Sequence, residues 1–493
     1  MKHWDCSAPS SMRSPALTII AESILKISSS TKLGFVARYL RSLGAFHRQR
    51  TELAGRMSKV KQKYQPVSTP SRVASNSAAS APARRLTASK ITTCRRYCTG
   101  FQLLHIGLHM NNTCMATFRI TTPMFIGGAD QKALDIRPAS VKGALRFWWR
   151  ALNWPRFAKA MGNEVAALRT LHDEEAKLFG LAASDNAGGQ GVFLLSLSQQ
   201  KIERTEQPFK DMAGEQLYLL GMGLGSFKGG NHTLRNALSG GEFTVRMLFR
   251  TRCDIADQKS VLDALYLFGL LGALGSRARH GMGSVSLSQW QADERIVPRT
   301  RDQYKAAITS MLTEVKNTLP PFTAFSTQTR IDISATDKAP LSLLTSVGAE
   351  QQLYRSYGKD GKVQGRQAER NFKPDHDLIY AATNGESIQS APARAVFGLP
   401  HNYFFSSSNG KADVNYAPNG ADSRRASPLL LHVHALGNDE YIAVHCLMPA
   451  LFLPSGAQIR IKARKTSNVD AMVDWTVLKN YLNRFTQRET LHG

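Results

Sequence analysis

The segment FRITTPMFIGGADQKALDIRPASVKGALRFWWR, from Phe118 to Arg150, contains the pattern that decides the fold. Its first residues are rich in β-branched and aromatic side chains as far as Pro123, which is typical of a strand. Gly127 and Gly128 open a polar loop, and Pro138 is a start signal for a helix. The segment therefore predicts a strand that passes through a loop into a helix.

The predicted helix has two different faces. Apolar residues recur with helical spacing at Val141, Ala144, Leu145, Trp148 and Leu152. Lys142, Arg146 and Arg150 are four residues apart and line a second face of the same helix. The apolar face suits a protein core, and the cationic face suits a phosphate backbone. An ordinary solvated basic face is the alternative interpretation.

Three motifs carry a resemblance to a known family. TPMFIGGADQ (122–131) followed by IRPASVKGALRFWWRAL (136–152) resembles the N-terminal signature of the RAMP superfamily of CRISPR RNA-binding proteins. GALGSRARHGMG (272–283) resembles the glycine-rich loop of that superfamily. RRASPL (424–429) resembles a segment of the subunit family named first in the type III-B Cmr effector complex. The ordered set is most similar to that subunit family.

The resemblance implies an α+β protein with two ferredoxin-like (RRM-like) domains packed together. We expect the first domain at residues 116–289, a helical connector at 290–325, and the second domain at 326–493. In the first domain the residues themselves predict the ferredoxin-like order of strand, helix, strand, strand, helix, strand. In the second half, periodicity alone supports only a mixture of helices and strands, with long insertions at 352–375 and 406–423.

Individual elements can also be predicted from the residues. Residues 174–181 read as an inserted helix. The nearly all-apolar segment 260–274 predicts a buried helix that stops at Gly275. Residues 458–463 read as a strand of the second ferredoxin-like domain.

The chain is strongly basic, and its charge is uneven. Its 493 residues have a formal charge of +26, which indicates a polyanionic partner. Residues 1–115 carry 18 Lys/Arg and 3 Asp/Glu, whereas the remainder carries 45 and 34. Because residues 69–90 are rich in Ser, Ala, Pro and Arg without periodicity, we expect a disordered basic extension over 1–115. A mis-called start codon would explain it, and a genuine nucleic-acid-binding tail is the alternative.

Other composition features exclude several classes of protein. No apolar run reaches transmembrane length. The six cysteines lack the paired spacing of a zinc site and are typical of a reducing cytoplasm. The second glycine-rich segment, 223–230, lacks the GKS or GKT ending of a nucleotide-triphosphate loop. We expect no cofactor and no membrane partner.

Single-stranded RNA is held by cationic grooves, aromatic platforms and backbone amides. The candidate RNA-binding residues are Lys142, Arg146, Arg150, Lys228, Gly275, Arg277, Arg279, His280, Gly281, Gly283, Arg424 and Arg425. We expect the glycines to let the main chain point its amides at phosphate. Removal of Lys142 with Arg146, or of Arg277 with Arg279, should weaken RNA binding without unfolding the protein.

The resemblance implies a non-catalytic subunit that contacts crRNA near its 3′ end, target RNA and other Cmr subunits. His280 is the only histidine within a matched motif, and one histidine without an ordered partner is a poor nuclease site. The alternative is a RAMP endoribonuclease acting through His280 or an aspartate. His432, His434 and His445 could ligate a metal, but satisfied histidines of a mixed sheet are the commoner explanation. We predict no metal site.

Overall fold

The computed structural model describes residues 112–128, 135–184, 187–312, 319–356, 361–418 and 421–493. All of them belong to one compact unit that extends from Leu104 to Gly493. The expected extension over residues 1–115 lies almost wholly outside the described residues. Strand β1 (Thr113–Ile120) begins before Met115, so the expected domain boundary falls within a strand.

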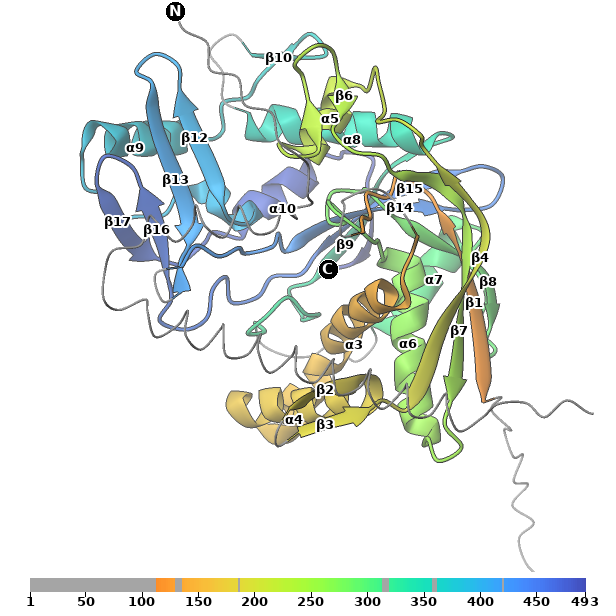
Figure 1. Ribbon diagram of the computed structural model, residues 1–493. Coiled ribbons are helices and arrows are strands. Elements are labelled where there is room, and N and C mark those ends of the chain that lie inside the picture. Colours follow the sequence, from red (N-terminus) through yellow and green to blue (C-terminus); the bar gives the residue numbers. More distant parts are fainter. Residues whose placement is uncertain (1–111, 129–134, 185–186, 313–318, 357–360, 419–420) are drawn as a thin grey trace, which may run out of the picture. The chain divides into compact units, whose positions relative to one another are not determined.

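The first four-stranded sheet has the order β4-β7-β1-β8, and every neighbouring pair is antiparallel. Its other strands are β4 (Phe193–Arg204), β7 (Leu238–Phe249) and β8 (Val285–Gln291). Helix α3 (Pro138–Met161) lies between β1 and β4 in the chain, and α6 (Ile255–Leu271) lies between β7 and β8. The two helices pack against each other and share one hydrophobic core with this sheet (Figure 1).

The sequence explains both helices. Pro138 occupies the first turn of α3, and Gly162 ends the helix in a left-handed conformation with φ of 61°. The expected apolar face is present, since Val141, Leu145 and Trp148 are buried. Helix α6 is buried on almost every side, as its composition predicts. It ends at Leu271, before Gly272 and not at the predicted Gly275.

Several elements are inserted into the first half of this unit. They are α4 (Glu164–Phe179), β2 (Gly180–Ser184), β3 (Ala187–Gln190), α5 (Gly214–Leu220), β5 (Gly225–Ser226) and β6 (His232–Thr233). Helix α4 packs along α3 and begins ten residues earlier than the segment 174–181 predicts. Asn163 caps its N-terminus by accepting a hydrogen bond from the Ala166 amide at 3.1 Å.

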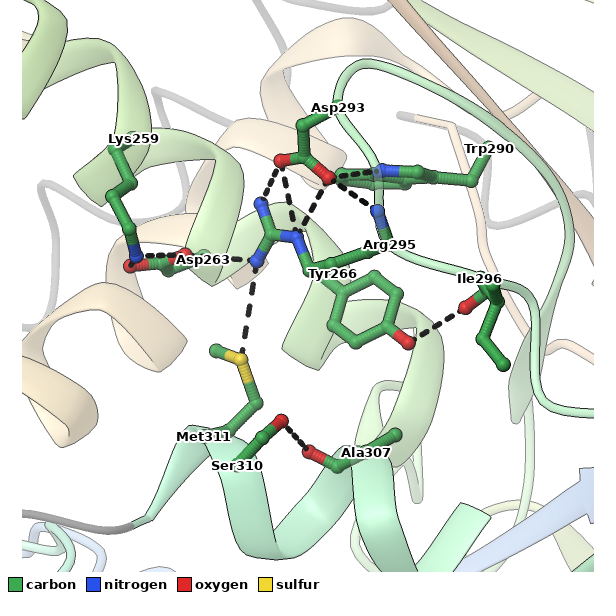
Figure 2. Close-up of polar contacts among 10 residues, drawn as sticks. All are labelled: Lys259, Asp263, Tyr266, Trp290, Asp293, Arg295, Ile296, Ala307, Ser310 and Met311. Atoms are coloured by element: carbon green, nitrogen blue, oxygen red, sulfur yellow. Dashed lines mark hydrogen bonds and ion pairs between the residues drawn. The ribbon is translucent and has the colours of Figure 1, made fainter. Parts of the chain in front are cut away.

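Arg295 links the segment that follows β8 to helix α6 through hydrogen bonds to two aspartates (Figure 2). Its Nε donates to Asp293 Oδ1 at 2.9 Å and its Nη1 to Asp263 Oδ1 at 2.8 Å. The guanidinium also lies 4.8 Å from the ring centre of Tyr266 and 5.0 Å from that of Trp290. Helix α7 (Arg301–Met311) follows and is the only described helix between residues 290 and 325.

The second four-stranded sheet has the order β14-β15-β9-β18. Its strands are β9 (Arg330–Asp337), β14 (Leu429–Ala435), β15 (Tyr441–Leu447) and β18 (Glu489–His492), with α8 (Pro340–Arg355) after the first and α10 (Thr476–Asn483) before the last. Numbered by their appearance in the chain, the strands of both sheets stand in the order second, third, first, fourth. The two halves therefore repeat one arrangement of strands and helices.

A third antiparallel sheet, β12-β13-β16-β17, lies within the second half of the chain. It consists of β12 (His401–Phe405), β13 (Gly410–Tyr416), β16 (Gln458–Lys462) and β17 (Thr466–Asp470), and α9 (Lys373–Asn384) packs against it. The short elements β10 (Lys362–Val363), β11 (Arg366–Gln367) and η1 (Ala393–Phe397) complete this half. The prediction for 458–463 was right about the strand and wrong about its sheet, because β16 pairs with β13 and β17.

Candidate nucleic-acid interface

The glycine-rich loop between α6 and β8 connects the two four-stranded sheets. Its Gly281 amide donates to the carbonyl of Leu431 in β14 at 3.1 Å, and the Leu431 amide donates to the Arg279 carbonyl at 3.0 Å. The Ser276 amide donates to Phe125 at 2.9 Å. The expectation that the glycines of this loop point their amides at phosphate was therefore wrong for Gly281 and Gly283, whose amides already donate to protein carbonyls.

The glycines of the loop permit close approach between protein segments. Gly275 has φ of +87°, and a Cβ there would lie 2.7 Å from the Phe125 carbonyl oxygen. Gly283 has φ of +64°, its amide donates to Pro123 at 2.9 Å, and a Cβ would lie 2.0 Å from the Leu274 oxygen. Both positions need the left-handed backbone and the small volume of glycine. These glycines serve the fold of the loop.

Arg277 and Arg279 emerge from this loop in different environments. Arg277 has φ of +63° and donates from Nη2 to the Met222 carbonyl at 3.1 Å. Arg279 donates to the Ser427 carbonyl and lies 5.2 Å from the ring centre of Phe147 in α3. Burial, and then the nearby charge of Arg425, lowers the pKa of Arg279 to about 10, so it stays charged at neutral pH. Within the described ranges, neither arginine pairs with a carboxylate.

The segment that contains Arg424 and Arg425 lies beside the same loop, because Arg279 of the loop donates to the carbonyl of Ser427. Arg424 is exposed. Arg425 donates from Nε to the Phe452 carbonyl at 2.6 Å and from Nη1 to Thr323 Oγ1 at 3.1 Å. Its Nη2 is buried without a hydrogen-bond partner in the part of the chain that the structure describes. The structure thus brings together two motifs about 150 residues apart.

His280 belongs to the same glycine-rich loop. Its backbone forms a parallel bridge with Leu431. Burial, and then the positive charges of Arg277, Arg355 and Arg279, lowers the pKa of His280 to about 3. The imidazole is therefore neutral at physiological pH.

The cationic face of α3 is largely engaged within the protein. Arg146 and Arg150 both bind Glu175 of α4, with Nη1–Oε1 distances of 3.0 and 2.9 Å. The Glu175 side chain is 7% exposed. Lys142 lies 5.3 Å from the ring centre of Phe193, and burial, then Arg146, lowers its pKa. Glu175 was not foreseen, because nothing in its local sequence marks a partner on another helix.

Two further predicted groups lie elsewhere. Lys228 is exposed between β5 and β6, beside Phe227, which is 62% exposed. His432, His434 and His445 are all buried within the second sheet. Among the described residues, no group of three or more His, Cys, Asp or Glu could hold a metal ion. The same residues include no helix that is long and apolar enough to cross a membrane.

Comparison with known proteins finds a match to one family over part of the chain. Residues 117–286 match the model of the RAMP superfamily. Over 59 residues the chain is 42% identical to the CRISPR system Cmr subunit Cmr1-2 of Pyrococcus furiosus, a match that spans 12% of this chain and 28% of the relative.

Two solved structures are similar at lower identity. Cmr1 from Pyrococcus furiosus in its apo form is 14% identical with a TM-score of 0.46, covering 77% of this chain and 99% of that one. A chain of the type III-B Cmr-beta complex bound to cognate target RNA is 12% identical with a TM-score of 0.41, covering 76% and 98%. The segment that matches the family model contains α3, most of the first sheet and the whole glycine-rich loop.

Proposed function

We propose that this chain is a non-catalytic RNA-binding subunit of a type III-B CRISPR (Cmr) ribonucleoprotein effector complex in antiviral defence. It contacts crRNA near the 3′ end and target RNA, and it works in the cytoplasm with other Cmr subunits. Each four-stranded sheet with its two helices is one ferredoxin-like domain. The RAMP match and the curated relative support the class of protein.

One observation carries the RNA-binding part of the proposal. Arg277, Arg279, Arg424 and Arg425, hereafter the arginine cluster, lie close together without a carboxylate partner in the described ranges. A buried cation is costly unless an anion compensates it. Two of these arginines are largely buried and donate to neutral acceptors only. A phosphate backbone supplies the missing negative charge.

The described residues favour binding over cleavage. His280 is neutral, and no second acid or base is hydrogen-bonded to its ring in the described part of the chain. The endoribonuclease alternative is tested by incubating the purified protein with end-labelled RNA, with and without Mg²⁺, and comparing the products with those of His280→Ala. Cleavage by the wild type that His280→Ala abolishes would establish the nuclease and overturn the non-catalytic assignment.

A salt titration tests the RNA site. Arg424→Ala should weaken RNA binding for every sequence and lower the slope of log affinity against log salt by roughly 0.7. Lys411→Ala removes an exposed cation from the third sheet and serves as the matched control. The proposal fails if the wild type does not bind RNA, or if both variants give the wild-type slope.

A further inference from the structure

A cavity of about 420 Å³ lies between α3, α4 and the segment that precedes β9. Its apolar lining includes Leu168 and Leu171 of α4, and its aromatic lining includes Phe147 and Phe322. Phe322 packs edge-on against Trp154 with ring centres 5.4 Å apart. The volume is in the range of pockets that bind small organic molecules.

The polar lining is cationic on balance. Arg150, Arg425, Glu175 and Thr323 all line the cavity. Glu175 is already neutralised by Arg150 and by Arg146 behind it. The charge of Arg425 therefore has no carboxylate partner, and its buried Nη2 has no acceptor among the described residues. An anionic group at this wall would satisfy both.

The cavity and the arginine cluster adjoin each other and share one residue. Arg425 belongs to both, and Arg279 lies over the Phe147 ring that forms part of the lining. A chain of RNA whose phosphates lie on the cluster therefore passes beside the cavity.

We propose that this cavity binds one nucleobase together with its attached phosphate, with the base against Phe147 and Phe322 and the phosphate on Arg425. Aromatic rings bind any base through its flat face, and a guanidinium binds phosphate oxygens. The nucleotide in the cavity has two sources. It is either an unstacked nucleotide of bound RNA, in which case the inference rests on the proposed function, or a free mononucleotide with the same base and phosphate.

The two sources are separated by two probes. The first is a single-stranded RNA with one 2-aminopurine, whose fluorescence falls when the base stacks on an aromatic ring. The second is adenosine monophosphate, titrated by calorimetry in the absence of RNA. Leu168→Trp fills the cavity from a half-buried position of α4. Val165→Trp places the same side chain on the exposed side of that helix and is the matched control.

We expect the wild type and Val165→Trp to quench 2-aminopurine equally, and Leu168→Trp to lose the quenching while it still binds RNA with an unchanged salt slope. Phe322→Ala should weaken binding of the occupying ligand about tenfold. If mononucleotide binding is the activity, adenosine monophosphate binds the wild type and not Leu168→Trp. If all variants quench 2-aminopurine equally and bind the mononucleotide equally, the proposal that the cavity binds a nucleotide is wrong. Absence of RNA binding by the wild type overturns the proposed function instead, and the mononucleotide titration still decides the pocket.

Discussion

Glu175 neutralises two arginines that the sequence pattern assigns to the molecular surface. Its carboxylate binds Arg146 and Arg150 while almost fully buried, so it couples α3 to α4. Glu175→Gln should lower the free energy of unfolding by about 1–3 kcal/mol, because charge-assisted hydrogen bonds are lost. Glu174→Gln, at the preceding position of α4, is the control and should change stability little. Urea unfolding curves measure both, and equal midpoints would contradict the structural role of Glu175.

Arg279 and Arg424 belong to one cluster but should respond differently to substitution. Arg279→Ala removes the hydrogen bond to Ser427 and the contact with the Phe147 ring, and it also removes a buried charge that has no carboxylate partner in the described ranges. Because these effects oppose each other, the variant should be destabilised by only about 1 kcal/mol. Arg424→Ala should leave the thermal midpoint unchanged, since the side chain is exposed. The expectation that Arg277 and Arg279 can be removed without a loss of stability does not suit the position of Arg279. Thermal melts that show no difference between the two variants would contradict this reasoning.

The glycine-rich loop depends on its left-handed positions. Gly283→Ala would place a Cβ 2.0 Å from the Leu274 oxygen at φ of +64°, so either the loop or the end of α6 must shift. We expect a loss of about 2–4 kcal/mol of stability. Gly143→Ala is the control, because a Cβ there meets nothing within 4 Å. In the middle of α3 that alanine should stabilise the helix by about 0.5–1 kcal/mol. Denaturant unfolding of both variants measures the contrast, and similar effects would contradict it.

Strand β1 gives a test of where the folded unit begins. Thr113 pairs with Leu248 and Cys114 with Met247, and the Cys114 side chain is fully buried. A chain that starts at Met110 keeps these pairs, whereas one that starts at Met115 loses them. The shorter chain should be less stable by about 1–3 kcal/mol. Thermal melts of both chains decide the point, and identical midpoints would mean that these pairs contribute nothing.

Local patterns predicted some elements well and could not predict others. The composition of α6 is apolar on all sides, so its burial follows from the sequence alone. The third sheet could not be foreseen, because β12 and β13 precede β14 while β16 and β17 follow β15. Alternating residues predict that β16 is a strand, but the choice of its partner depends on contacts between distant segments.

In the candidate RNA site, too, the sequence reveals the motifs but not which residues lie close together. The motifs that contain Arg277, Arg279, Arg424 and Arg425 could be found from the sequence through the RAMP resemblance. Their proximity, and the absence of a carboxylate partner within the described ranges, depend on the packing of one sheet against the other. The role of Glu175 could not be found, since the pattern of α3 shows only its cations. Burial decides which of these charges face solvent.

The buried histidines of the second sheet make the stability of the whole molecule dependent on pH. Burial lowers the pKa of His432 and of His445 to about 3, and it lowers that of His434 as well. In the unfolded chain a histidine has a pKa of about 6.5. Below that pH the unfolded state therefore binds protons that the folded state does not, and stability is lost as the pH falls from 6.5 toward 3.

The expected loss between pH 7.5 and 5.5 is about 1.4 kcal/mol for each histidine, or about 4 kcal/mol for the three. Most carboxylates stay ionised in this range, so they contribute little to the change. His445→Gln removes one titrating group, so the free energy of unfolding should depend less steeply on pH, by about one proton. The variant should also be less stable at neutral pH, because it loses the contacts with Ser334 and Tyr481. Urea unfolding at pH 7.5, 6.5 and 5.5 measures these slopes, and equal slopes for the wild type and His445→Gln would show that the buried histidine does not titrate on unfolding.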